Sequence, residues 1–296
     1  MQGADRLYAS MQLTTAMKDG GYALSILVFT KALPPSAFQC LPQSPVKHVA
    51  GSLNGEGGAA TQENTSIPVP EVVEDWEEND HAFIVSRRVP GKTLHEPWAT
   101  LSDEQKKTIA REVAEYLAQL RRLQSDRMEA VGGRPIYCDL LILRAEGDRR
   151  SNVPHGPLSS DVELWAEMEG SLKGPPEAAR MRLRSRMPPA EPYTFTHCDL
   201  TDVNIMVENG HLTGIIDWEM SGYFPVWWEY ACTSIVDSEE DSEWKALLRP
   251  YMPNYEQARE FWRDYYYLSI WPQSDRAKAF LEETEKEGVD GGISSC

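Results

Sequence analysis

The sequence predicts an α+β fold of two lobes, with a small β-rich lobe first and a larger, mainly helical lobe after it. Three observations support this: β-like runs gather before residue 90, one long amphipathic helix follows them, and the C-terminal third carries helical patterns rich in aromatic residues. A chain of 296 residues, 41% of them hydrophobic, can bury such a core without disulfides. We expect lobes at 1–88 and 89–285 and a frayed tail at 286–296.

The N-terminal lobe is predicted from short extended segments. Tyr22–Thr30 is a β-like run, although residues 1–45 otherwise show little pattern. Ser66–Pro70 must run extended, because each of its two prolines fixes its own φ and restricts the residue before it. Glu71–Val73 and Ala82–Val85 then read as two strands separated by an acidic turn.

A helix is predicted to begin after Ser102, whose hydroxyl can form a capping box with Gln105 three residues later. Apolar side chains then recur at intervals of three and four, which gives one buried stripe made of Ile109, Val113, Tyr116, Leu117, Leu120 and Leu123. The stretch Leu123–Ser160 is rich in glycine, proline and charge, so we expect a long surface loop there. Glu239–Lys286 is expected to be mainly helical.

Net charge and cysteine usage exclude several classes of protein. The formal net charge of −17 argues against a nucleic-acid partner. The longest apolar run is far shorter than the roughly 20 residues that a membrane span needs. The five cysteines are scattered and form no C-x-x-C pair, so neither a disulfide framework nor a zinc site is indicated. We therefore expect a cytoplasmic protein without nucleic-acid or membrane partners, whose oligomeric state the sequence does not determine.

A β-hairpin is predicted in the segment that carries most of the chemistry. Ile205–Val207 and Leu212–Ile216 are β-like runs joined through Asn209-Gly210, the strongest short signal for a two-residue type I′ turn. If these two residues form the loop, Asn204 lies opposite Ile215 in a regular register. The open end of the hairpin is then the place where polar side chains gather.

Three oxygen-bearing side chains meet at that open end. Asn204 closes one strand, Asp217 lies two residues past the other strand's pairing point, and Asp199 stands just upstream. Carboxylate and amide oxygens suit Mg²⁺, which typically takes only one or two protein carboxylates together with substrate phosphates. Asn204 and Asp217 fit this role, while Asp199 can orient or deprotonate a hydroxyl that attacks a phosphorus atom.

The spacing His197-x-Asp199-x-x-x-x-Asn204, followed by Asp217, is the pattern of a kinase catalytic loop and its metal-binding aspartate. On these residues the chain resembles the aminoglycoside phosphotransferase family of the protein-kinase-like fold, particularly its fungal members of unknown substrate. The likeness covers about Val46 to Trp271 and includes the segments Asn64–Pro70, Phe83–Gly91, Asp217–Glu219 and Pro225–Tyr230.

The resemblance implies ATP-dependent phosphorylation of a small-molecule hydroxyl. It implies that Ser86–Arg88 form the hinge whose backbone meets adenine, with Ser86 and Arg88 at its ends. Lys47 would steady the phosphates with Glu56 as its partner. Three glycines nevertheless surround Glu56 where a helix is needed, and no glycine-rich phosphate loop precedes Lys47.

Two other functions stay open on the sequence. One is a pseudokinase or nucleotide-binding protein with an incomplete N-terminal lobe and no transfer activity. The other is a metal-dependent phosphohydrolase built on His197, Asp199 and Asp217, which would not need Lys47.

Two further groups of residues have a structural and a functional interpretation. Trp227-Trp228 could form a cage for a cationic substrate but are expected to be core between helices. The carboxylates of Asp237, Glu239, Glu240, Asp241 and Glu243 could line a pocket for a cationic amino-sugar, although a solvated acidic loop is the favoured interpretation.

Overall fold

The computed structural model describes most of the chain after residue 80 and parts of the chain before it. The described residues are 14–18, 22–30, 65–70, 72–78, 81–136, 138, 140–143, 154–218 and 220–293. They pack as two compact units that interleave along the sequence. The first unit holds Met1–Leu120, Asp199–Ser221 and Ser238–Leu248, and the second holds Arg121–Cys198, Gly222–Asp237 and Arg249–Cys296. The simpler division at residue 88 stays a prediction.

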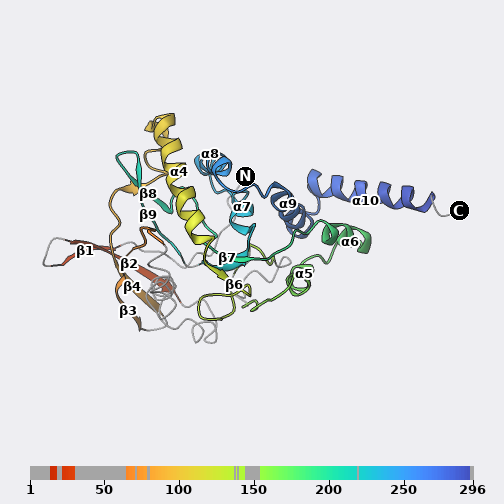
Figure 1. Cartoon of the computed structure of the whole chain (residues 1–296), viewed down its shortest axis with the longest axis horizontal. Helices are drawn as coiled ribbons and strands as arrows, with labels where there is room; N and C mark the ends of the chain where they lie inside the picture. The colour runs from red at the N-terminus through yellow and green to blue at the C-terminus, as the bar shows by residue number, and fades with distance from the viewer. Residues whose placement is uncertain are drawn as a thin grey trace. The chain divides into compact units, whose positions relative to one another are not determined.

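The first unit contains a four-stranded antiparallel sheet in the order β1-β2-β4-β3 (Figure 1). Its strands are β1 (Thr14–Lys18), β2 (Tyr22–Thr30), β3 (Val72–Glu78) and β4 (His81–Arg87). Tyr22–Thr30 is therefore a strand, as expected. The acidic residues after Val73 belong to β3 and not to a turn, because Trp76 and Glu77 pair with Phe83 and Ala82 in a tight hairpin.

A second, three-stranded sheet in the same unit carries the predicted hairpin. It has the order β5-β8-β9, with β5 (Lys92–Thr93), β8 (Ile205–Glu208) and β9 (His211–Ile215). Asn209 and Gly210 have φ values of 54° and 80°, the left-handed pair that a type I′ turn requires. Gly91 lies against this sheet with a φ of 91°, and a Cβ at that position would stand 2.2 Å from the Val207 carbonyl oxygen.

Helix α4 (Asp103–Leu120) begins where the capping box predicts. The Ser102 N–H donates to Gln105 Oε1 at 3.0 Å, and the Gln105 N–H donates to Ser102 Oγ at 3.3 Å. Its buried stripe contains Ile109, Val113, Leu117 and Leu120, with Ala110 added and Tyr116 half-buried. The helix packs against β9 and against α8 (Glu239–Leu248), which Figure 1 shows alongside it.

The second unit is mainly helical. A small sheet in the order β10-β7-β6 is made of β10 (Gly222–Pro225), β7 (Tyr193–Thr196) and β6 (Gln124–Ser125). The helices are α5 (Asp161–Glu169), α6 (Glu177–Ser185), α7 (Trp228–Cys232), α9 (Glu256–Ile270) and α10 (Asp275–Ile293). Single 3-10 turns occur at η1 (Trp98–Thr100) in the first unit and η2 (Arg249–Tyr251) in the second.

Aromatic side chains fill the core of the second unit between α7 and α9. Trp227 and Trp228 are fully buried and make edge contacts with Phe261 and Trp262, at centroid distances of 6.1 and 5.8 Å. The interpretation of Trp227-Trp228 as core is therefore confirmed. Edge-to-face packing of this kind stabilises aromatic clusters beyond the area that they bury.

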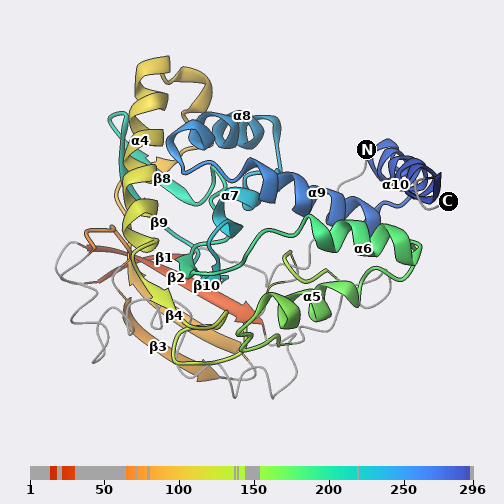
Figure 2. The same ribbon diagram turned by 45° about the vertical axis from the view of Figure 1, so that its right-hand side comes forward.

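The C-terminal helix differs from the frayed tail expected at 286–296, because α10 is helical as far as Ile293. Figure 2 shows α10 beside α6 and α9. Arg182 on α6 forms ion pairs with Glu283 and Glu287, one helical turn apart, at 3.0 and 2.9 Å. These ion pairs hold two successive turns of α10 against α6. Among the described helices, none combines the length and the apolar composition that a bilayer crossing requires.

Candidate active site

The hairpin brings Asn204 and Asp217 together with a register one residue different from the prediction. Pairing runs normally from Glu208–His211 to Val207–Leu212, and then a bulge shifts it, so that Ile205 lies opposite Ile215. The Ile216 N–H consequently donates to the Asn204 carbonyl oxygen at 3.0 Å. Asn204 is thus paired with Ile216 and not with Ile215, and Asp217 lies one residue past it.

The extra residue that causes the shift is Thr213 on β9. Its hydroxyl donates to the Pro90 carbonyl oxygen at 2.6 Å, outside the hairpin. The next residue, Gly214, has no side chain to collide with Val89, whose Cγ1 would stand 2.5 Å from a Cβ there. The bulge therefore follows from contacts with the chain that precedes β5, which no local pattern reveals.

Asn204 and Asp199 are joined directly. The Asn204 side-chain N–H₂ donates to the Asp199 carbonyl oxygen at 2.9 Å and to its carboxylate Oδ2 at 3.1 Å. Asn204 is buried, and Asp199 is half-buried. Because the amide nitrogen is committed to Asp199, the amide oxygen of Asn204 is the atom that can face a cation.

Left-handed backbone marks both ends of this site. Among the described non-glycine residues, positive φ values occur at Cys198 (74°), Asn209 (54°) and Asp217 (64°). The value at Asn209 is explained by the turn. Cys198 immediately precedes Asp199, and Asp217 is itself a predicted site residue. Such conformations cost of order 1 kcal/mol or more and tend to occur at functional sites. After Asp217, the buried Trp218 indole donates to the Ile215 carbonyl oxygen at 2.8 Å and fixes the exit from the hairpin.

Helix α8 contacts the segment Asp199–Asn204, the predicted catalytic loop. The Asp202 N–H donates to Asp241 Oδ1 at 3.1 Å, and Lys245 Nζ donates to Asp241 Oδ2 at 2.8 Å. The Trp244 indole donates to the Leu200 carbonyl oxygen at 3.0 Å. Asp241 and Lys245 are both buried, so the interpretation of this acidic segment as a solvated loop is wrong for Asp241. The Asp-x-x-x-Lys spacing on a helix was the signal that could have identified the pair.

The segment after β5 contacts the same loop on its other side. The His95 N–H donates to the Asp202 carbonyl oxygen at 3.2 Å, and His95 Nδ1 lies 2.8 Å from Asp202 Oδ2. The hydrogen bond to Asp202 raises the pKa of His95. Burial raises the pKa of Asp202, although His95 opposes that effect. Asp202 is therefore held through its N–H, its carbonyl and its carboxylate.

In the second unit, Glu229 on α7 holds the start of the motif. Its carboxylate accepts the N–H of His197 at 2.6 Å and the N–H of Cys198 at 3.2 Å. His197 and Cys198 are buried, and burial raises the pKa of the Cys198 thiol well above its usual value. A buried thiol with a raised pKa is a poor nucleophile, so Cys198 has a structural place in the loop. Sequence reasoning did not identify Glu229 as a residue that positions the loop.

The remaining predicted site residues belong to the N-terminal segment. Lys47 and Glu56 lie outside the described residues. Ser86 is within β4, where it pairs with Ser25 of β2 and Val72 of β3. Arg88 is exposed and comes just after the strand. The hinge at Ser86–Arg88 therefore stays a prediction.

Asp199, Asn204 and Asp217 lie at the end of one hairpin, as the sequence predicts for a phosphoryl-transfer site. Comparison with protein families agrees: residues 44–263, well over half of the chain, match the model of the phosphotransferase enzyme family. The chain belongs to this family and is a small-molecule phosphotransferase. Its described residues form sheets and helices, in agreement with the α+β class that the sequence predicts. No curated protein sequence matches it significantly.

Solved structures of similar architecture include aminoglycoside and macrolide phosphotransferases. A thermostable mutant of aminoglycoside phosphotransferase APH(4)-Ia with AMP-PNP and hygromycin B matches at 18% identity and a TM-score of 0.47, covering 95% of this chain and 88% of that chain. The streptomycin–ATP complex of APH(2")-IIa matches at 14% and 0.48, covering 93% and 91%. Macrolide 2'-phosphotransferase MphH from Brachybacterium faecium matches at 12% and 0.48, covering 94% and 88%. Sequence identities of 12–18% and TM-scores of 0.47–0.48 are too low to indicate the substrate of this chain.

Proposed function

We propose that this phosphotransferase moves the γ-phosphoryl group of ATP to a hydroxyl of a small molecule. The observation that carries the proposal is the end of the β8–β9 hairpin, where Asn204 is paired with Ile216, next to Asp217, and donates its amide hydrogens to Asp199. This arrangement supports one carboxylate for the hydroxyl and a separate pair of oxygen donors for a cation.

The donor set fits Mg²⁺. The Asn204 amide oxygen and the Asp217 carboxylate are hard oxygen donors, and Mg²⁺ typically completes its shell with phosphate oxygens and water. Among the described residues no group of three His, Cys, Asp or Glu side chains gathers around one point, so a cation here would depend on the nucleotide for further ligands. Bound Mg²⁺ would supply neutralisation of the phosphate charge.

The role of Asp199 follows from its own contacts. The Asn204 amide holds Oδ2 of the Asp199 carboxylate, which fixes the direction of the remaining oxygen lone pairs. A hydroxyl that donates to this carboxylate is oriented for attack and can pass its proton to it. Hydrogen bonds fix the backbone on both sides of Asp199: Asp241 accepts the Asp202 N–H, and Glu229 accepts the His197 N–H. A fixed position of Asp199 matters for the proposed reaction because small misplacements of a catalytic group lower the rate strongly.

The proposal is tested by thermal-shift titration with ATP and Mg²⁺, followed by ADP release with a panel of hydroxyl acceptors. Asp217→Ala should abolish stabilisation by ATP–Mg²⁺, and Asp199→Asn should keep that stabilisation but lose acceptor-dependent ADP release. Glu208→Gln, an exposed carboxylate at the hairpin turn, is the matched control and should behave like the original chain. Absence of any stabilisation by ATP–Mg²⁺ would refute the proposal, and phosphate release independent of every acceptor would indicate a hydrolase instead.

A further inference from the structure

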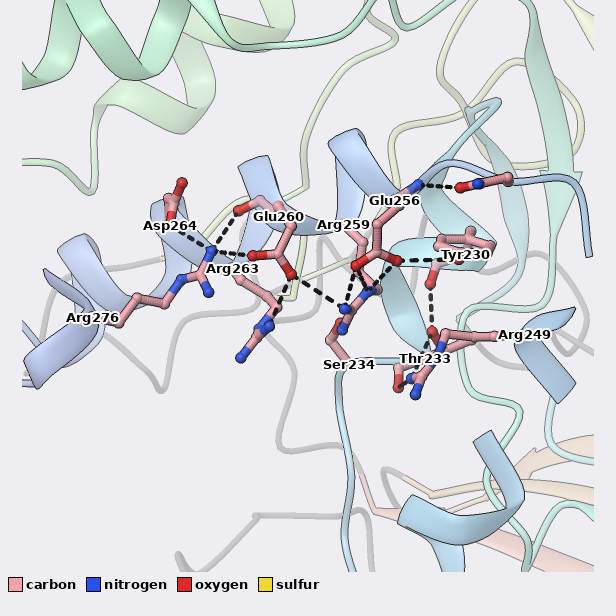
Figure 3. A network of polar contacts seen from close by, with 11 residues as sticks. Tyr230, Thr233, Ser234, Arg249, Glu256, Arg259, Glu260, Arg263, Asp264 and Arg276 are labelled. Atoms are coloured by element: carbon pink, nitrogen blue, oxygen red, sulfur yellow. Dashed lines mark hydrogen bonds and ion pairs between the residues drawn. The ribbon is translucent and has the colours of Figure 1, made fainter. Parts of the chain in front are cut away.

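Most of the described ion pairs keep their charges over the physiological pH range. In the network of Figure 3, the carboxylates of Glu256, Glu260 and Asp264 are paired with arginines, whose guanidinium groups stay protonated. The carboxylate of Asp202 in the first unit differs, because it is paired with the imidazole of His95, whose Nδ1 lies 2.8 Å from Asp202 Oδ2. The charge of this pair therefore depends on pH near neutrality.

Asp202 is a buried carboxylate beside another buried carboxylate. Its side chain is 4% exposed, and burial and the charge of Asp241 both raise its pKa. Lys245, whose Nζ lies 2.8 Å from Asp241 Oδ2, supplies one positive charge to this pair of carboxylates. Within the group, two negative charges and one positive charge leave an excess of one negative charge, which protonated His95 offsets. The His95 side chain is 46% exposed, so it can exchange its proton with water.

The further charges that act on His95 from α8 are negative as well. The carboxylates of Glu240 and Asp241 both raise the pKa of His95, in addition to the larger effect of its hydrogen-bonded partner. On the segment of His95 itself, Lys92 and Glu96 pair with each other at 3.5 Å and are both exposed, so they add little net charge. The surroundings of His95 thus favour its protonated form from two sides, the segment Asp199–Asn204 and α8.

Asp202 belongs to the turn that carries the site residues. The Asn204 N–H donates to the Thr201 carbonyl oxygen at 3.0 Å, so Asp202 is the second residue of a turn that ends at Asn204. The Asn204 amide holds Asp199 in its place. His95 contacts the turn twice, since its N–H also donates to the Asp202 carbonyl oxygen at 3.2 Å. A weaker bond to the Asp202 carboxylate therefore loosens the turn that positions Asn204 and Asp199.

We propose that His95 is a positioning residue: its imidazolium holds the turn Thr201–Asn204 in the arrangement that orients Asp199, and loss of its proton lowers turnover. The effect on turnover rests on the proposed function, whereas the effect on the turn does not. The contribution of the imidazolium is complete below pH 6.5, the ordinary histidine pKa. It disappears as pH rises through the pKa of the folded state, which the pairing with Asp202 raises.

Hydrogen exchange measures the turn without any ligand or reaction. Exchange of the peptide that contains Asp202–Asn204 is followed from about pH 6 to about pH 9, corrected for the intrinsic pH dependence of exchange. His95→Gln keeps a hydrogen-bonding side chain without the charge, and His95→Lys keeps a positive charge throughout this range. We expect His95→Gln to exchange about two- to fivefold faster than the original chain at the acid end and equally fast at the alkaline end, while His95→Lys exchanges slowly at both ends.

His211→Gln is the matched control. His211 Nδ1 lies 2.7 Å from Glu112 Oε1 in the same unit, so this variant also removes a histidine–carboxylate pair, but one that does not contact the turn Thr201–Asn204. It should leave exchange of the peptide unchanged at every pH.

Acceptor-dependent ADP release connects the turn to the reaction. The kcat of each variant is divided by the kcat of the original chain at the same pH, which cancels the pH dependence of the reacting groups. The ratio for His95→Gln should rise towards one as pH increases, because the original chain loses the same charge. The ratio for His95→Lys should rise above its acid-end value, because lysine keeps the charge that the original chain loses.

The two measurements separate failure of this inference from failure of the proposed function. Exchange of His95→Gln that equals the original chain at every pH, or differs from it by the same factor at every pH, would overturn the positioning role of His95. A kcat ratio without pH dependence would also overturn it, although the reaction would stand. If exchange responds as expected while ATP–Mg²⁺ fails to bind, the effect of His95 on the turn stands and the proposed phosphotransferase reaction falls instead.

Discussion

The buried ion pair between Asp241 and Lys245 gives the sharpest test of how the catalytic loop is supported. Their side chains are 0% and 4% exposed, and their charged atoms are 2.8 Å apart. Lys245→Met leaves the Asp241 carboxylate buried without this ammonium group. Removal of one partner of a buried pair costs about 3–5 kcal/mol, a large part of a typical free energy of unfolding of about 5–15 kcal/mol. We therefore expect a marked loss of stability in urea denaturation.

The double variant Asp241→Asn/Lys245→Met removes both charges but keeps an amide oxygen for the Asp202 N–H. It should recover most of the loss, because a buried pair contributes little net stability compared with neutral residues of similar volume. A second double variant, Asp241→Leu/Lys245→Met, has no acceptor for that N–H and should be less stable by about 1–3 kcal/mol. Its acceptor-dependent turnover should fall while affinity for ATP–Mg²⁺ is kept. If the asparagine double variant is no more stable than Lys245→Met, the reasoning is refuted.

Two further predictions concern the first unit. Gly91→Ala should lower the free energy of unfolding by at least about 2 kcal/mol, because φ is positive there and the new Cβ would collide with the Val207 carbonyl oxygen. Gly174 has open space around it and serves as the control. In the same denaturation assay, Gly174→Ala should be neutral or slightly stabilising. A raised pKa of His95 means that its bond to Asp202 adds stability below pH 6.5, the ordinary histidine value, and that this contribution disappears as pH rises through the folded-state pKa. The difference in free energy of unfolding between the original chain and His95→Gln should therefore shrink with rising pH. It should stay below about 1 kcal/mol, because the His95 side chain is 46% exposed. A difference that grows with pH would contradict a stabilising bond between protonated His95 and Asp202.

Local chemistry made parts of this fold predictable. The capping box at Ser102 and the turn at Asn209-Gly210 each depend on residues three or fewer positions apart, so their signals are contained in the sequence. The two β-like runs on either side of that turn likewise predict that Asn204 and Asp217 lie at the open end of one hairpin. The spacing of His197, Asp199, Asn204 and Asp217 carried the family resemblance.

Contacts between distant segments were not predictable in this way. The pairing of Asn204 with Ile216 depends on a bulge stabilised by Pro90, more than a hundred residues earlier. The burial of Asp241 depends on the Asp202 N–H, which local polarity cannot indicate, so an acidic segment was interpreted as solvated. Glu229 was noticed as part of a motif, but its bonds to His197 and Cys198 become visible only when α7 is placed beside the loop.

The bulge at Thr213 also sets where this hairpin can tolerate a change in length. Without Thr213, regular pairing would place Met206 opposite Gly214 and Asn204 opposite Ile216, which are the same partners as now. The bulge therefore absorbs one residue without displacing Asp217. Deletion of Thr213 would lose its bond to Pro90 but leave the two proposed cation ligands neighbours, whereas a residue removed between Ile215 and Asp217 would shift the aspartate itself. Length variation among relatives is thus expected on the turn side of Gly214 and not beyond it.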